Sequence, residues 1–234
     1  MQLRSGDDEQ PEEPLARGTT LPASGTRLQG CRPAPRGIEQ QYTERNGGRT
    51  TSSTSSCGRA GHPADVGPAS VLLTRAFAGS LQGIPIQDAR QYCLDSLKQV
   101  PRGVLLVARL QPDDPALLPP GQASRVVATT GLSFCRATRE DFPTLQPPDE
   151  AVYLSNMAVD GKLRRYGFAR LMLAAAEGLA AAQGGRQLYL HARLADAPAQ
   201  QLYLSSGYAV VGRDGFLAKL RGITPRALMV KPLQ

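Results

Sequence analysis

The sequence predicts a mixed α/β fold, with helices on the faces of the sheet. Two observations lead to this prediction. From about residue 66 onward, strand-like and helix-like segments alternate along the chain. In the middle of this region two strand-like segments, 103–109 and 125–135, follow each other with only a Pro- and Asp-rich turn between them. Alternation interrupted by consecutive strands is typical of a mixed sheet.

The first half of this region holds two predicted helices and three predicted strands. Apolar residues recur at helical spacing in 69–77 and 86–100, and in the second segment they are Ile86, Ala89, Tyr92, Cys93 and Leu97. The apolar runs at 103–109, 125–135 and 151–159 predict strands. Loops are expected between the strands, at 111–122 and 138–149.

The second half repeats the alternation of helix and strand. A helix is predicted over 166–183, where Gly184 and Gly185 end it. Its apolar stripe consists of Phe168, Leu171, Met172, Ala175 and Leu179. A strand at 187–192, a helix at 197–205 and strands at 208–213 and 226–230 complete the prediction.

Residues 1–65 differ from the rest of the chain. Residues 1–13 are polar and acidic, and the stretch to His62 is rich in Arg, Ser, Thr, Gly and Pro. Such a segment cannot offset the entropy lost on ordering, so disorder is predicted. The Arg-rich composition of residues 17–59 is that of an organellar transit peptide, whereas the acidic start departs from it. An untargeted tail and an incorrect start codon are the alternatives, and the folded domain is predicted over 66–234.

The composition limits the classes of partner. A net charge of +7 permits an anionic ligand or nucleic acid. Aromatic residues make up only 5%, without Trp, and the basic residues are scattered, which argues against a nucleic-acid-binding surface. Four Cys without CxxC spacing and only two His argue against a metal site. No apolar run approaches the ~18 residues of a membrane span, so no membrane partner is predicted.

The stretch KLRRYGFARLML, residues 162–173, follows a predicted strand and opens a predicted helix. The first turn of a helix leaves N–H groups without internal partners, and the helix dipole adds positive character. Gly167 allows an anion to approach the main chain closely. Positive charge around the same point comes from Lys162, Arg164, Arg165 and Arg170. The pattern favours a pyrophosphate site, and a basic turn before an amphipathic helix is the alternative.

A second pattern, LYLHARLADAPAQQLYLSSGY at 188–208, runs from strand through loop and short helix into another strand. Together the two patterns resemble the GCN5-related N-acetyltransferase (GNAT) family. The first family motif has Arg or Gln, then Gly, then Gly or Ala, which here are Arg164, Gly167 and Ala169. The second motif is matched by Asp196, Ala199, Leu202, Tyr203, Gly207 and Tyr208, with Asp196 where the family usually has Asn. The likeness is strongest to the plastid acetyltransferases of plants and algae.

The resemblance implies a mixed, mostly antiparallel twisted sheet flanked by helices, and acetyl-CoA as co-substrate. The family's first strand is expected just before Ala69, but CGRAGHPADVGP at 57–68 does not read as a strand. The pantetheine arm is expected along the main chain of Met157, Ala158 and Val159. The phosphates are expected at Arg164, Arg165, Tyr166, Gly167, Phe168, Ala169 and Arg170. Asp196, Ala197 and Pro198 are the remaining expected cofactor contacts.

Two catalytic residues follow from the same resemblance. Tyr203 is expected to be the general acid that protonates the leaving thiolate, and a core Tyr is the alternative. His191 is the expected general base, and a half-buried strand His with satisfied hydrogen bonds is the alternative. Glu150 and Tyr153 are rival candidates for the base or for substrate placement.

The predicted function is acetyl transfer to a protein amine, either an N-terminal α-amine or a lysine ε-amine. A small-molecule amine or amino acid is an alternative acceptor, and a non-catalytic CoA-binding or basic nucleic-acid-binding protein is an alternative of another class. The acceptor groove is expected at the loops 79–86, 111–124 and 212–224. The plastid is the expected location, with the cytoplasm as the alternative, and the sequence makes no prediction of oligomeric state.

Overall fold

The computed structural model describes residues 38–46, 49–78, 83–112, 118 and 120–234. The predicted transit peptide lies largely outside the described residues. Eight strands form one sheet in the order β1-β2-β3-β4-β5-β6-β8-β7. Every neighbouring pair is antiparallel except β5 and β6. The mixed, mostly antiparallel sheet that the sequence predicts is therefore confirmed.

The strand bounds follow the predicted segments from β3 onward. They are β1 Ile38–Asn46, β2 Arg49–Ala60, β3 Gly103–Pro112, β4 Arg125–Ser133, β5 Val152–Val159, β6 Gln187–Arg193, β7 Ala209–Arg213 and β8 Arg226–Pro232. The helices are α1 Val66–Phe77, α2 Ile86–Lys98, α3 Phe168–Ala182, α4 Ala197–Ser205 and α5 Phe216–Leu220. The five-residue α5 is the one described α-helix without a sequence prediction, because it is too short to show a period.

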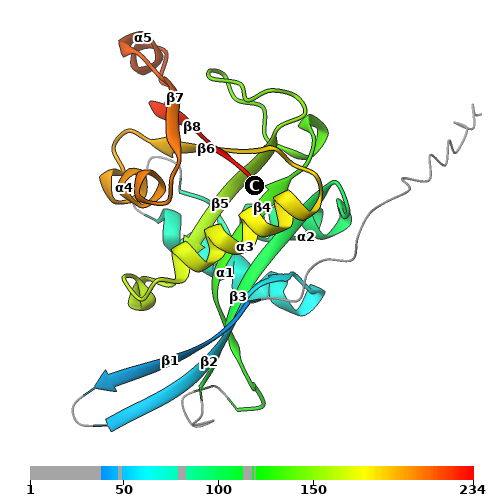
Figure 1. Ribbon diagram of the computed structural model, residues 1–234, viewed down its shortest axis with the longest axis vertical. Helices are drawn as coiled ribbons and strands as arrows, with labels where there is room; N and C mark the ends of the chain where they lie inside the picture. The colour runs from blue at the N-terminus through cyan, green and yellow to red at the C-terminus, as the bar shows by residue number, and fades with distance from the viewer. Residues whose placement is uncertain (1–37, 47–48, 79–82, 113–117, 119) are drawn as a thin grey trace, which may run out of the picture. The chain divides into compact units, whose positions relative to one another are not determined.

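Helices cover both faces of the sheet, as Figure 1 shows. α3 packs on β3, β4 and β5 from one side, and α1 packs on β4 and β5 with α2 beside it on β3. The larger core lies under α3 and includes Phe168, Met172 and Leu179 of the predicted stripe. The smaller core lies under α1 and α2 and includes Leu105 and Val107 of β3. Alternation along β3 supplies both layers, since successive strand residues point to opposite faces.

Residues 38–46 and 49–60 lie in the segment for which the sequence predicts disorder. They form β1 and β2, and β2 pairs with β3 over two stretches separated by a bulge. β2 thus occupies the place of the strand expected just before Ala69. Ladder hydrogen bonds join main-chain groups, and Thr-rich segments have high strand propensity. A polar strand of this kind lacks the apolar alternation on which the sequence prediction depended.

Within the described part of the chain, no helix is long and apolar enough to cross a membrane.

Candidate active site

The parallel strands β5 and β6 separate partway along their length. They pair only from Val152 to Leu154 on β5 and from Leu188 to Leu190 on β6, although both strands continue further. On its other side β5 remains paired with β4 as far as Val159. One edge of β5 beyond Leu154 is therefore open, and the opening lies in the middle of the sheet.

A β-bulge marks the point where the strands separate. Gly131 pairs with Ser155 and Thr129 pairs with Ala158, so two β5 residues stand opposite the single Thr130. Asn156, the first of the two, has a φ of 51°. Such bulges increase local twist and re-aim the strand. The bulge therefore turns the second half of β5 away from β6.

The open edge presents main-chain N–H groups. The Asp160 N–H bonds to the Val127 oxygen of β4 at 2.8 Å. Because N–H directions alternate along a strand, those of Met157 and Val159 point the other way, toward the opening. Two donors at this spacing can pair with an extended amide-containing chain as a neighbouring strand would. This is the position that the sequence predicts for pantetheine.

The loop between β5 and α3 leads from this edge to a helix N-terminus. Asp160 accepts a hydrogen bond from the Lys162 N–H at 2.9 Å, and Leu163 anchors the loop in the core. Gly167 is the N-cap of α3 with a φ of 88°, a conformation that L-residues with a Cβ rarely adopt. The first N–H group with a partner inside the helix is that of Leu171, which donates to the Gly167 carbonyl. The earlier Ala169 and Arg170 amides are thus oriented for an external anion.

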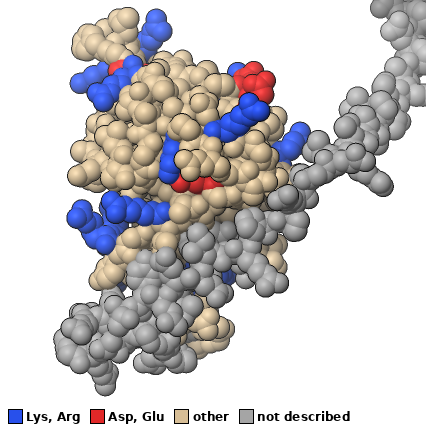
Figure 2. Space-filling model, viewed as in Figure 1, with Lys and Arg blue, Asp and Glu red and all other residues tan. Residues whose placement is uncertain are grey.

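Basic side chains surround that helix start. Lys162, Arg164, Arg165 and Arg170 are all exposed, and Figure 2 shows basic residues near this loop as well as near α5. Arg165 has a φ of 73°, so two left-handed positions, Arg165 and Gly167, lie on either side of Tyr166. Arg170 also reaches Ser205 of α4 at 3.3 Å, which ties the start of α3 to α4.

The predicted contacts on α4 have a structural role of their own. Asp196 is the N-cap of α4 and accepts a hydrogen bond from the Ala199 N–H at 3.1 Å. A carboxylate at an N-cap is stabilised by the helix dipole. Asp therefore replaces the family's usual Asn without loss of the cap. Ala197 and Pro198 form the exposed first turn that follows.

Tyr203 lies on α4 and packs edge-on against Tyr208, with ring centroids 5.9 Å apart. Tyr203 is buried, with 8% of its surface exposed. Burial, and secondly the charge of Asp196, raise the pKa of Tyr203 to about 12. The phenol is therefore protonated at neutral pH and can act as a donor.

His191 contacts two groups through its ring. Its Nδ1 lies 2.8 Å from the Tyr153 hydroxyl, and its Nε2 lies 3.1 Å from the Leu145 carbonyl oxygen. A carbonyl only accepts, so Nε2 carries the proton and Tyr153 donates to Nδ1. Burial, and secondly the nearby Arg226, lower the pKa of His191 to about 4. The predicted base thus has both nitrogens engaged in this structure.

The loop between β4 and β5 covers this pair. Phe142 packs against the His191 ring with centroids 4.3 Å apart and against the Tyr153 ring at 5.2 Å. The Arg226 guanidinium lies over the Phe142 ring, 5.5 Å from its centroid. Burial raises the pKa of Tyr153 well above its usual range. The two rival candidates for the base or for substrate placement therefore differ in location. Tyr153 belongs to this buried cluster, whereas Glu150 is exposed.

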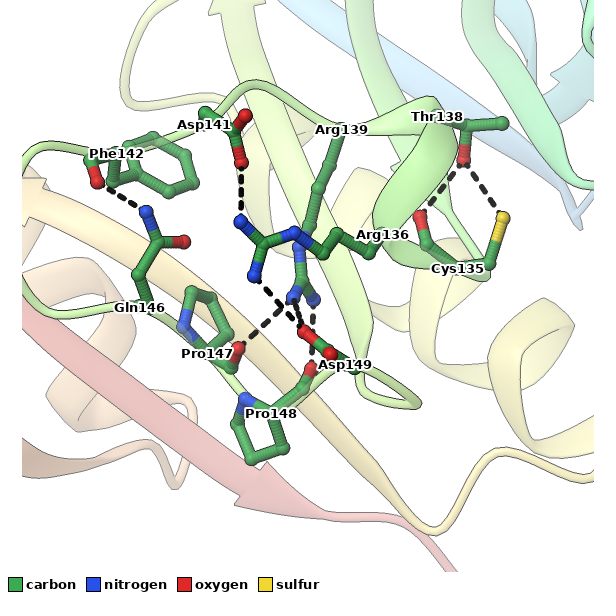
Figure 3. A network of polar contacts seen from close by, with 10 residues as sticks. All are labelled: Cys135, Arg136, Thr138, Arg139, Asp141, Phe142, Gln146, Pro147, Pro148 and Asp149. Atoms are coloured by element: carbon green, nitrogen blue, oxygen red, sulfur yellow. Dashed lines mark hydrogen bonds and ion pairs between the residues drawn. The ribbon is translucent and has the colours of Figure 1, made fainter.

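A buried guanidinium holds the same loop together, as Figure 3 shows. Arg139 has a side chain only 1% exposed and donates to the Pro147 and Pro148 carbonyls at 2.9 and 2.8 Å. The exposed Arg136 forms ion pairs with Asp141 and Asp149 at 3.0 and 3.2 Å. The sequence predicted only a loop here, because nothing in 138–149 has a regular period that would reveal the network.

Beyond Leu145 an open hollow continues toward α5. It is lined by Thr144, Leu145, Arg213, Asp214, Gly215, Phe216, Leu217, Ala218, Arg221 and Ile223. Most of the loop 212–224, which was expected to bind the acceptor, thus lies at this hollow. Thr144 and Leu145 of the β4–β5 loop also line it, although the sequence did not place that loop in the acceptor groove. The loops 79–86 and 111–124 lie partly outside the described residues. Within the described ranges no group of three or more His, Cys, Asp or Glu is arranged to hold a metal ion.

The site therefore combines an open strand edge, a helix N-terminus beside it and a phenol donor on the facing helix. These parts suit an elongated, anionic, amide-containing ligand. A separate cluster of His191, Tyr153 and Phe142 lies on the other face of the sheet, next to the hollow.

Sequence comparison gives the same assignment as this geometry. Residues 110–208 match the model of the acetyltransferase (GNAT) family. The chain is 30% identical over 168 residues to GCN5-related N-acetyltransferase 5, chloroplastic, of Arabidopsis thaliana. The match covers 70% of this chain and 51% of that protein, so the chain spans about half the length of the curated relative it matches.

Solved structures share the fold. The ribosomal-protein-S18-alanine N-acetyltransferase of Escherichia coli superposes with a TM-score of 0.52 at 18% identity, covering 78% of this chain and 94% of that chain. The protein yncA of Salmonella typhimurium, solved with its cofactor acetyl-CoA, has a TM-score of 0.52 at 14% identity and covers 77% and 94%. With the family motifs placed at the open strand edge, at the start of α3 and on α4, this chain carries an acetyltransferase domain of the GNAT family.

Proposed function

We propose that this protein transfers the acetyl group of acetyl-CoA to a protein amine, by direct attack of the amine on the thioester. The observation that carries the proposal is the open edge of β5 beside the N-terminus of α3. A thioester on a long amide-containing arm with a pyrophosphate at its other end fits these two features together.

The main chain would hold most of the co-substrate. Met157 and Val159 N–H groups would pair with the pantetheine amides, and the first-turn amides of α3 would receive the pyrophosphate. Arg164, Arg165 and Arg170 would contribute charge from the solvent side. Specific side chains are not needed for such contacts, because any sequence that adopts this fold has main-chain N–H groups at the strand edge and at the helix N-terminus.

Tyr203 would donate a proton to the leaving sulfur. The new C–N bond forms as the C–S bond breaks, and the sulfur takes the Tyr203 proton. The acceptor nitrogen loses one proton to water, from which Tyr203 is reprotonated. The buried, protonated hydroxyl of Tyr203 supports this role.

The state of His191 bears on the acceptor. A group with a pKa of about 4 is a weak base at neutral pH, and its accepting nitrogen is already bonded to Tyr153. The enzyme would then depend on amine that is already neutral. At pH 7.5 this is roughly 30% of an α-amine of ordinary pKa, but only about 0.1% of a lysine. We therefore propose the N-terminal α-amine as the preferred acceptor, with His191 positioning Leu145 and Tyr153.

The relative in Arabidopsis thaliana is chloroplastic by name, and residues 17–59 have the composition of a transit peptide. Both support a plastid location for this protein. Import of the full chain fused to a fluorescent protein, compared with a fusion that starts at Ile38 and keeps β1 and β2, would test it. Equal distribution of the two fusions would contradict the proposal.

The activity itself is tested by release of CoA thiol with acetyl-CoA and a peptide panel. The panel should contain peptides with a free N-terminus and no lysine, peptides with a blocked N-terminus and one lysine, and small amines. Turnover is expected mainly with the first set. Turnover on small amines alone would establish the alternative acceptor class, and acetyl-CoA binding without any turnover would indicate a non-catalytic binding protein.

A further inference from the structure

The β5 bulge has a support on the face of the sheet opposite α3. The Tyr92 hydroxyl, from α2, lies 3.1 Å from the Ser155 Oγ, immediately before the bulge residue Asn156. The Ser155 carbonyl accepts a hydrogen bond from the Thr130 hydroxyl at 2.9 Å. Ser155 is thus held from α2 by its side chain and from β4 by its main chain.

Gly131 provides the space for this contact. A Cβ on Gly131 would lie 2.1 Å from the Tyr92 hydroxyl and 2.8 Å from the Ser155 Oγ. Both distances are far below a normal van der Waals contact, so the side chain of any other residue would displace the Tyr92 hydroxyl. The glycine is therefore needed for close approach and not for a special backbone angle.

The location of the contact gives it a consequence for the site. Beyond the bulge β5 has lost its partner β6, and β4 is its remaining strand neighbour. The N–H groups of Met157 and Val159 lie within the next four residues of Ser155. A shift at Ser155 would therefore be transmitted directly to the edge proposed to bind pantetheine. Burial raises the pKa of Tyr92, while hydrogen bonding with Ser155 and Asn156 opposes that rise, so the hydroxyl remains protonated.

We propose that Tyr92 is a positioning residue for acetyl-CoA, which acts through the slot at Gly131 and the Ser155 side chain to fix the bulge. The inference rests on the proposed function, because it takes the β5 edge as the cofactor-binding edge. Tyr92 itself would not contact the reacting atoms.

The first test is Tyr92→Phe in the full chain, with the Kd for acetyl-CoA measured by calorimetry and the KM and kcat measured separately. Loss of one such hydrogen bond should weaken acetyl-CoA binding about fivefold and raise its KM similarly, with kcat at saturation little changed. Tyr189→Phe is the matched control, since the Tyr189 hydroxyl likewise bonds to a side chain, that of Gln187, but at an exposed site. It should leave the Kd unchanged.

A double-mutant cycle identifies the path. If Tyr92 acts through Ser155, the double variant Tyr92→Phe/Ser155→Ala should bind acetyl-CoA no worse than the weaker single variant. Gly131→Ala should bind worse than Tyr92→Phe, and adding Tyr92→Phe to it should restore part of the affinity, because the hydroxyl that clashes is removed. Additive losses in the cycle would overturn the inference.

The outcomes separate the inference from the proposed function. Wild-type protein that does not bind acetyl-CoA would overturn the proposed function and the inference with it. Wild-type protein that binds acetyl-CoA, together with a Tyr92→Phe variant of equal Kd, would overturn the inference alone. A loss of affinity in Tyr92→Phe without a comparable loss in Tyr189→Phe would support it.

Discussion

The two sides of the β5–β6 opening differ in the groups that they present to a ligand: main-chain groups on one side and side chains on the other. On the α3 side the proposed contacts are main-chain N–H groups of β5 and α3, fixed by a bulge and a left-handed Gly167. On the opposite side the surface consists of side chains from the β4–β5 loop and from β6, held by Arg139 and His191. Main-chain recognition constrains a few backbone angles, whereas side-chain recognition constrains many residues weakly. A change that moves the main chain of β5 or of the α3 start should therefore affect acetyl-CoA, and one in the β4–β5 loop or at His191 of β6 should affect the acceptor.

The strongest test of this division is Gly167→Val beside Arg165→Ala. A β-branched residue at a φ of 88° is strained by about 2 kcal/mol or more and would move the first-turn amides. We expect kcat/KM for acetyl-CoA to fall about 100-fold in Gly167→Val. Arg165→Ala removes one exposed charge and should cost about two- to threefold.

The comparison is made on thiol release with a fixed, saturating peptide, and circular dichroism checks that both variants are folded. A larger loss in Arg165→Ala than in Gly167→Val would mean that charge, and not the main chain, holds the phosphates.

The next largest effect is expected for Tyr203→Phe. Removal of the proton donor should lower kcat about 30-fold, since general acid catalysis contributes roughly 10²- to 10⁴-fold and water can replace part of it. The melting temperature should change little, because the Phe ring keeps the packing of Tyr203 against Tyr208. Tyr208→Phe is the control, as the Tyr208 ring packs against that of Tyr203 and its hydroxyl is likewise buried. Equal kcat losses in the two variants would exclude Tyr203 as the acid.

The sequence can propose these two residues because their signals are local. Glycine is the residue type that most readily adopts the φ of Gly167, and Tyr203 keeps a fixed spacing to Gly207 along one helix and turn. Both lie in local patterns that a sequence records directly. From β3 to β8 the strands were predictable for the same reason, since apolar runs reveal buried strands.

The remaining parts depend on contacts between distant residues. Tyr92 and Ser155 are 63 positions apart, and Tyr153 and His191 are 38 apart. Neither pair forms a local pattern, and Arg139 looks like any polar loop residue although its side chain is buried. His191 was predicted as the general base, whereas its low pKa arises from burial and from Arg226, which a sequence does not display. β1 and β2 escaped prediction because their composition is polar.

On the acceptor side the largest expected effect is that of Arg139→Met. The variant keeps the buried volume but leaves two proline carbonyls without their donor, which should destabilise the loop by about 1–3 kcal/mol. We expect the KM for the peptide acceptor to rise about tenfold, since 1.4 kcal/mol corresponds to tenfold. The KM for acetyl-CoA should change by less than about twofold, because the β4–β5 loop lies away from the α3 side.

Arg136→Met is the matched control for Arg139→Met. Its ion pairs with Asp141 and Asp149 are exposed, and such pairs contribute about 0–1 kcal/mol. It should therefore leave both KM values nearly unchanged. If Arg139→Met altered the two KM values in parallel, the β4–β5 loop would not be specific to the acceptor.

The smallest effect at neutral pH belongs to His191, and it grows as the solution becomes acidic. The folded-state pKa of about 4 lies below the ordinary value of about 6.5, so the unfolded chain binds a proton first as the pH falls. The contribution of His191 to stability is therefore complete above about pH 6.5 and is lost progressively down to about pH 4. Between pH 7.5 and pH 5 the loss should be about 2 kcal/mol, or about 5 °C in melting temperature.

His191→Gln offers a donor and an acceptor but cannot be protonated, so its melting temperature should fall less over this range. Parallel curves for the two proteins would show that the ring is not neutral between Tyr153 and Leu145, and the preference for α-amines argued from its low pKa would lose its basis.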